Sequence, residues 1–183
     1  MPAGDWLWPA IWLMPAHNVY GTWPSSGEID LVESRGNRNM LQNGLHIGTQ
    51  EAGSTLHYGP YPELNGWERA HWIRRNSNGY NTNFHRYQLE WTPDFLRFSI
   101  DDVELGRVTP GAGGFWDFGG FGNGRNILNP WRYGSKMAPF DQKVHFPPFY
   151  LRPKLDNTFG SVGCTSYEAA RHGFEYRPRH AFV

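Results

Sequence analysis

The sequence lacks several features that define common protein classes. It contains one cysteine, Cys164, among 183 residues, so no disulfide can form within the chain. Its 17 acidic residues balance 17 basic ones, which excludes the electrostatic footprint expected of nucleic-acid or anionic-membrane partners. No stretch approaches the roughly 18 apolar residues of a membrane span, and no charged-then-apolar leader opens the sequence. We therefore expect a soluble chain, without such partners and without an export signal of its own.

The markers of several enzyme classes are absent as well. The sequence has no P-loop, no His-Glu-x-x-His pair, no Gly-x-Ser-x-Gly elbow and no Asn-x-Ser/Thr glycosylation site. Phosphoryl transfer, zinc proteolysis and serine esterase chemistry therefore lack support. His57, His71 and His85 show no metal-ligand spacing, and we interpret them as surface or core residues. We expect neither a metal nor a cofactor.

Aromatic and chain-turning residues are abundant instead. Aromatic residues make up 16% of the chain, and 22 glycines and 14 prolines accompany them. This composition is typical of an all-β, loop-rich protein that binds something flat and polar, such as a sugar ring. A tryptophan-rich β core explains the composition equally well, and composition alone does not separate the two. The length fits a single domain.

Short strand-like runs recur between turns, and no long helical stripe is present. Tyr87, Leu89 and Trp91 alternate on one face of the run 84–91, and Asp101-Asp102 predicts a tight hairpin turn between two further runs. The predicted strands are residues 10–13, 28–33, 45–48, 84–91, 95–100 and 103–108. Such evenly spaced strands indicate a sandwich or barrel. Residues 111–134 are predicted to form a long functional loop rather than a regular element, because they carry eight glycines and six aromatic rings.

Three acids occur within one predicted strand. Glu28 and Asp30 share a face, because side chains two residues apart in a strand point the same way. Glu33 would then point into the core, where an isolated charge costs several kcal/mol. A β-bulge at Leu31 or Val32 would insert one extra residue and return Glu33 to the face of the other acids. We therefore predict a bulged strand with three acids on one face.

Such a constellation suits a retaining glycosidase. That chemistry needs two carboxyl groups roughly 5 to 5.5 Å apart, one ionised to attack the anomeric carbon and one protonated to assist the leaving oxygen. A third carboxyl group between them raises at least one pKa and can orient the nucleophile. A solvated acidic strand face is the competing interpretation of the bare acid pattern.

Several longer motifs surround these acids. They are residues 6–12 (WLWPAIW), 20–24 (YGTWP), 27–37 (GEIDLVESRGN), 53–59 (GSTLHYG), 87–93 (YQLEWTP) and 129–131 (NPW). Together they resemble glycoside hydrolase family 16, and most of all its laminarinase-like branch of animal β-1,3-glucanases and β-1,3-glucan-binding proteins. The resemblance runs from residue 4 to about residue 146. It implies a concanavalin-like β-sandwich, or jelly roll, with a concave substrate cleft.

The resemblance also implies roles for individual residues. Glu28 corresponds to the nucleophile, Asp30 to its orienting partner and Glu33 to the acid/base. Among the substrate-binding residues, Trp23 would stack on a glucose ring next to the cleavage point and Trp12 would lie nearby. His46 would be a polar cleft residue on the neighbouring strand, and Trp116 would belong to a loop bordering the cleft. Each of these last four residues could instead serve core or rim packing.

The chain departs from the family pattern at both ends. Met1 aligns with the interior of the family domain, so we expect residues 1–146 to form a partial catalytic domain with an incomplete sandwich. After residue 146 the family continues into an apolar strand, whereas this chain continues with Pro147-Pro148, and proline pairs do not sit in central strands. We interpret residues 147–183 as an unmatched tail that arises from a shifted reading frame, a mis-spliced exon or a retained intron. Lost strands should leave open sheet edges.

Three functions follow from the resemblance. The first is retaining endo-hydrolysis of β-1,3-glucan of the laminarin type. The second is a β-1,3-glucan-binding protein of innate immunity that needs no chemistry, and the third is an inactive fragment of either. The intact acids favour the enzyme. The resemblance further implies an extracellular monomer whose partner is a β-1,3-glucan polysaccharide or oligosaccharide.

Overall fold

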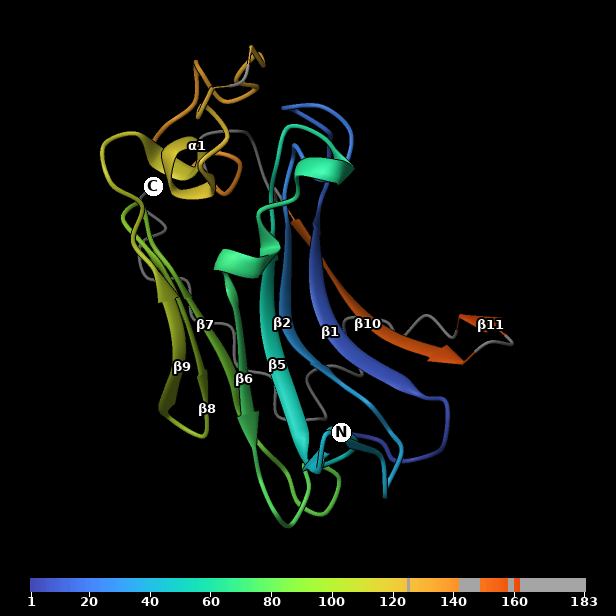
Figure 1. Ribbon diagram of the computed structural model, residues 1–183. Coiled ribbons are helices and arrows are strands. Elements are labelled where there is room, and N and C mark those ends of the chain that lie inside the picture. Colours follow the sequence, from blue (N-terminus) through green and yellow to red (C-terminus); the bar gives the residue numbers. More distant parts are fainter. Residues whose placement is uncertain (125, 142–148, 158–159, 162–183) are drawn as a thin grey trace.

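The protein is built almost entirely of β-strands arranged in sheets. The computed structural model describes residues 1–124, 126–141, 149–157 and 160–161, and the last two ranges are described by their backbone. Figure 1 shows the two main sheets of the sandwich, of which the larger has six strands and the smaller has three. The predicted all-β class is confirmed. Among the described residues, no helix has the length and apolar composition to cross a membrane.

The six-stranded sheet has the order β11-β10-β1-β2-β5-β6, and all its neighbouring strands run antiparallel. The strands are β1 (Trp8–Pro15), β2 (Glu28–Ser34), β5 (Glu51–His57), β6 (His71–Arg75), β10 (Phe149–Asn157) and β11 (Gly160–Ser161). The predicted runs 10–13 and 28–33 lie within β1 and β2. Strands β5 and β6 were not predicted as strands. Six of the seven β5 residues are buried, polar ones included. The β5 sequence therefore lacks the apolar–polar alternation from which a strand is predicted.

The smaller sheet has the order β7-β8-β9, with β7 (Tyr87–Trp91), β8 (Leu96–Ile100) and β9 (Val103–Val108). Buried and half-buried residues alternate along β7, as the sequence predicted, and also along β8. β7 begins three residues later than predicted, and Phe84 is 83% exposed. A separate two-stranded sheet joins β3 (Leu41–Gln42) to β4 (Leu45–His46).

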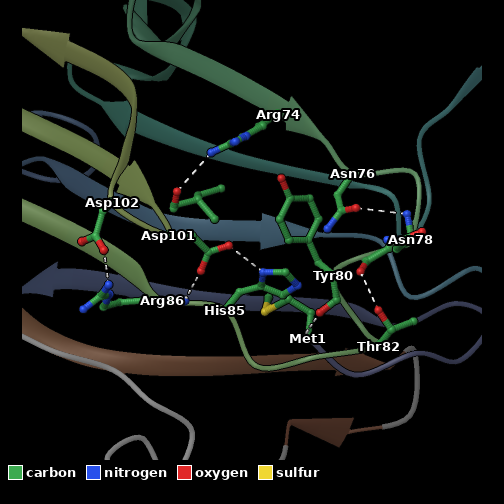
Figure 2. A network of polar contacts seen from close by, with 12 residues as sticks. Met1, Arg74, Asn76, Asn78, Tyr80, Thr82, His85, Arg86, Asp101 and Asp102 are labelled. Atoms are coloured by element: carbon green, nitrogen blue, oxygen red, sulfur yellow. Dashed lines mark hydrogen bonds and ion pairs between the residues drawn. The ribbon is translucent and has the colours of Figure 1, made fainter.

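The predicted hairpin turn at Asp101-Asp102 is present. Both residues adopt positive φ angles, 52° and 63°, a backbone conformation that joins antiparallel strands tightly. Figure 2 shows how side chains hold this turn: Asp101 accepts a hydrogen bond from the Arg86 amide at 2.8 Å and pairs with His85 Nδ1 at 2.8 Å. His85 therefore serves the fold, as its interpretation as a surface or core residue predicted.

The core lies between the two main sheets. Ile29 and Leu56 of the large sheet and Phe98 of the small one are fully buried, and the Trp72 ring of β6 contacts the Phe98 ring with centroids 5.5 Å apart. Burying each such side chain stabilises the fold by about 1.5–3 kcal/mol relative to exposure. The core therefore fixes which face of β2 is turned inward.

The segment 111–134 differs from its prediction. It contains the helix α1 (Gly114–Gly119), so the expectation of a loop without regular structure is wrong. Phe115, Phe121 and Trp131 are at most 4% exposed and pack around Tyr58, which comes from the end of β5. These aromatic rings form core packing. Glycines and aromatic rings misled the prediction because they serve a compact, turn-rich core as well as a binding surface.

Residues 149–157, within the segment expected to be an unmatched tail, form β10. This strand pairs with β1 from Trp8↔Asp156 to Pro15↔Phe149, so the expected open edge beside β1 is covered by this strand. Pro147-Pro148 and Cys164 lie outside the described residues. The origin of the tail as a reading-frame or splicing product stays a prediction.

Candidate functional site

β2 carries the predicted bulge. On its pairing with β5, Asp30 faces Thr55 and Glu33 faces Gly53, so Leu31 and Val32 together face the single residue Ser54. The pairing with β1 shifts at the same place. The Ser54 hydroxyl donates a 2.7 Å hydrogen bond to the Leu31 carbonyl oxygen and so holds the bulge. The bulge at Leu31 or Val32 is confirmed.

The bulge places three acids on the face of β2 that points away from the core. Ile29 and the bulge residues Leu31 and Val32 are at most 2% exposed and belong to the core, whereas Glu28 and Glu33 are half-buried. Asp30 is only 3% exposed. A buried carboxylate requires compensating partners, and neighbouring side chains provide them.

His57 is the partner of Asp30. Its Nε2 lies 3.1 Å from Asp30 Oδ2, and it stands opposite Glu28 in the register of β2 and β5. Glu28 also shares a hydrogen bond with Asp30. The interpretation of His57 as a plain surface or core residue is therefore wrong. The motif at residues 53–59 contained His57, but only the strand register brings it to the acids.

Burial and the charge of Asp30 perturb the two outer acids. Burial first, and then the negative charge of Asp30, raises the pKa of Glu28 from 4.5 to about 7. The same two causes, in the same order, raise the pKa of Glu33 from 4.5 to about 7. Either side chain can therefore hold or release a proton near neutral pH, which is what general acid–base chemistry requires.

Tryptophan side chains adjoin the acids. Trp23, 38% exposed, donates a 2.6 Å hydrogen bond from Nε1 to Glu28 Oε2, and its ring centroid lies 5.7 Å from that of His57. Trp12 on β1 stands opposite Asp30 in the strand register. Trp8, which the sequence did not single out as a site residue, hydrogen-bonds to Glu33. These contacts bring two of the predicted substrate-binding residues together with the acids.

The other two predicted substrate-binding residues lie elsewhere in the fold. His46 is an exposed residue of β4 in the small β3–β4 sheet, and the strands next to β2 are β1 and β5, so its expected place on the neighbouring strand is wrong. Trp116 lies in α1 and packs against Phe121 and Trp131. It also lines a pocket of ≈ 180 Å³ whose lining includes none of the three acids.

The described part of the chain contains no group of three or more His, Cys, Asp or Glu side chains placed to hold a metal ion. The groups that meet at the acids are carboxyl groups, one imidazole and indole donors.

Comparison with known proteins fits this site. Residues 2–114, which include β1, the acids, His57 and the three tryptophans beside the acids, match the family described as glycosyl hydrolases family 16. The chain belongs to glycosyl hydrolase family 16. The recognition made from the sequence motifs is confirmed, as is the sandwich fold.

The relatives include both enzymes and binding proteins. A β-1,3-glucan-binding protein of Penaeus monodon is 47% identical over 146 residues, covering 79% of this chain and 38% of that protein. A glucan endo-1,3-β-glucosidase of Cryptopygus antarcticus is 35% identical over 117 residues, covering 64% of this chain and 39% of that protein. The chain thus spans about two fifths of the length of these two relatives.

Among solved structures, the laminarinase from Rhodothermus marinus superposes with a TM-score of 0.53 at 28% identity. The match covers 82% of this chain and 48% of that one. This family 16 member therefore shares its sandwich with a solved laminarinase.

Proposed function

We propose that the protein is a retaining, endo-acting β-1,3-glucanase. The observation that carries the proposal is the bulged strand, which places Glu28, Asp30 and Glu33 on one face and raises the pKa of both outer acids to about 7. A protein that only binds glucan gains little from burying three carboxyl groups. Relatives named as a glucan endo-1,3-β-glucosidase and a β-glucanase support the substrate class.

The proposed reaction has two steps. Glu33, protonated, gives its proton to the leaving glycosidic oxygen while the Glu28 carboxylate attacks the anomeric carbon and forms a glycosyl-enzyme. A water molecule then attacks that carbon, Glu33 takes the water proton, and the bond to Glu28 breaks. The indole hydrogen bond from Trp23 favours the ionised form of Glu28, as a nucleophile requires. Asp30, hydrogen-bonded to Glu28, orients it.

Aromatic rings would position the sugar. The half-exposed Trp23 ring, fixed at Glu28, suits stacking on a glucose ring beside the bond to be cleaved. Trp12 would contribute from the neighbouring strand. We do not assign substrate contact to Trp116, because its ring contacts other aromatic rings of the core.

A second candidate is a non-catalytic β-1,3-glucan-binding protein. The relative from Penaeus monodon, with 47% identity, carries that name, and further relatives from insects share it. In this alternative the aromatic side chains would hold the glucan and the acids would contribute hydrogen bonds only.

Release of reducing ends from laminarin distinguishes the two candidates. We expect the wild-type chain to release them and Glu33→Gln to lower the rate by about 10²- to 10⁴-fold, the usual contribution of a general acid–base group. Glu28→Gln should lose at least as much. Glu63→Gln, which changes an exposed acid in the short helix Pro62–Leu64, is the matched control and should leave the rate unchanged.

The binding measurement completes this test. Laminarin binding by the wild type and by Glu33→Gln should be of similar strength, because the substitution removes a proton donor and keeps the shape. The enzyme would be rejected, and the binding protein supported, if the wild type binds laminarin but releases no reducing ends, and if Glu33→Gln does not change that release.

A further inference from the structure

We propose that Asn65 is a positioning residue that determines which nitrogen of His57 carries the proton, and thereby fixes how His57 meets Asp30. The inference rests on the proposed function, since it concerns the same acids. It goes beyond that function because Asn65 contacts the imidazole of His57 and acts through it.

Asn65 lies between the two short helices Pro62–Leu64 and Trp67–Arg69. Its Oδ1 accepts two backbone hydrogen bonds, from the Tyr58 amide at 3.3 Å and from the Trp67 amide at 3.2 Å. Two donors on one oxygen fix the orientation of the side-chain amide, because the NH₂ group cannot replace an acceptor. The Nδ2 of Asn65 is therefore the atom that faces His57 Nδ1, at 2.8 Å.

This orientation determines the histidine tautomer. An amide NH₂ only donates, so His57 Nδ1 must accept with its lone pair, and the proton of the neutral ring is on Nε2. That nitrogen lies 3.1 Å from Asp30 Oδ2. In a doubly protonated ring, His57 Nδ1 and Asn65 Nδ2 would both be donors at 2.8 Å, and no hydrogen bond could form between them. Asn65 therefore favours the tautomer whose proton is on Nε2, the nitrogen that faces Asp30.

The charge of His57 matters for the neighbouring acids. A positive charge on His57 lowers the pKa of Glu28 and of Glu33, and so opposes the effect of Asp30. His71 of β6 interacts electrostatically with His57 as well, and the Trp23 ring lies beside it. Asn65, which fixes the ring, therefore acts on both glutamates through His57.

The test is ¹⁵N NMR of the histidine side chains in the free protein at pH 7. We expect wild-type His57 to show the neutral ring with its proton on Nε2. Asn65→Asp keeps the oxygen that accepts the two backbone amides but replaces the NH₂ donor with an acceptor. We expect His57 in this variant to be protonated on both nitrogens at the same pH.

Asn76→Asp is the matched control. Asn76 Oδ1 also accepts the backbone amide two residues ahead, that of Asn78 at 3.0 Å, but it lies in the network of Figure 2, among residues that include His85 rather than the acids. This variant should leave the His57 signals unchanged. The comparison separates loss of a turn contact from the change at His57.

Kinetics on laminarin add a second readout. Asn65→Asp should lower kcat by about 10–100-fold, the usual effect of removing a residue that fixes a histidine tautomer at a metal site, while KM changes little. A wild-type proton on Nδ1, or His57 signals that Asn65→Asp leaves unchanged, would overturn the inference. Failure of the proposed function would look different, because wild-type protein would then release no reducing ends whatever the tautomer.

Discussion

At the scale of residues, the site depends on two carboxyl groups whose pKa the fold raises above the ordinary value. Glu28 and Glu33 are half-buried on either side of Asp30, in sequence and along the strand. Removing water from a carboxyl group disfavours its charged form, and the negative neighbour adds to that effect. The protein must therefore be less stable when these acids are forced to ionise.

This cost predicts a pH dependence of stability. Both acids have a folded pKa of about 7, above the ordinary 4.5. Below about pH 4.5 both states hold the protons and the full contribution to stability is present. Between pH 4.5 and about 7 the unfolded chain releases protons that the folded protein keeps, so the free energy of unfolding falls as pH rises. Above about pH 7 the contribution of these two acids to the free energy of unfolding is lost completely.

Thermal denaturation of Glu33→Gln across this range checks the prediction. The Tm of the variant relative to wild type should rise as pH increases from about 4.5 to about 7, because glutamine has no proton to lose. Glu63→Gln should show a constant offset over the same range. A Tm difference for Glu33→Gln that does not vary with pH would contradict the assigned burial of this acid.

At the scale of elements, the bulge of β2 connects packing to the site. It lets Ile29, Leu31 and Val32 enter the core while the acids stay on the other face. The hydroxyl of Ser54, itself 2% exposed, satisfies the carbonyl oxygen of Leu31. A buried carbonyl without a partner is costly, so this hydrogen bond stabilises the bulge.

Ser54→Ala tests the importance of that hydrogen bond. We expect the free energy of unfolding to fall by about 1–3 kcal/mol, since a buried acceptor loses its donor. Ser34→Ala is the matched control: Ser34, also on the large sheet, is buried and donates a 2.7 Å hydrogen bond to the Glu51 carbonyl oxygen. Both variants should lose stability in urea denaturation.

Only the bulge variant should also affect the site. Ser54→Ala should slow laminarin hydrolysis, because a looser bulge misplaces Glu33 relative to Asp30, whereas Ser34→Ala should leave the rate of the folded protein unchanged. Equal rates for the two variants would contradict the role of the bulge in placing the acids.

At the scale of the whole molecule, close contact between the two main sheets holds the sandwich together. Gly106 of β9 faces Trp72 of β6, and a Cβ built on this glycine would lie 2.1 Å from the Trp72 ring atom Cδ2. The ring contacts Phe98 of the small sheet in a tilted arrangement and cannot easily move away. Glycine is required here because the sheets approach so closely.

Gly106→Ala should therefore destabilise the sandwich by about 1–3 kcal/mol, the usual cost of overpacking a core. Gly111→Ala is the control, because a Cβ at that position meets nothing within 4 Å. Urea denaturation of the two variants measures the difference. Equal midpoints would show that the two sheets can move apart at no cost.

Several features of the fold depend on local chemistry and could be predicted from the sequence alone. Strand alternation, the turn at Asp101-Asp102 and the bulge between Asp30 and Glu33 each follow from side-chain spacing or backbone preference, and each is present. The motifs around the acids also identified the family. These features depend on residues that are close along the chain, so they can be read from the chain.

The residues that contact the acids from distant parts of the sequence could not be predicted, because tertiary packing brings them there. His57 reaches Asp30 through the register of β2 and β5, and Asn65 reaches His57 through the loop that follows. The same folding turned Trp116 toward the aromatic core and kept Trp23 at Glu28. A histidine, an asparagine or a tryptophan suits a site or a core equally well, and its role depends on the neighbours that packing provides.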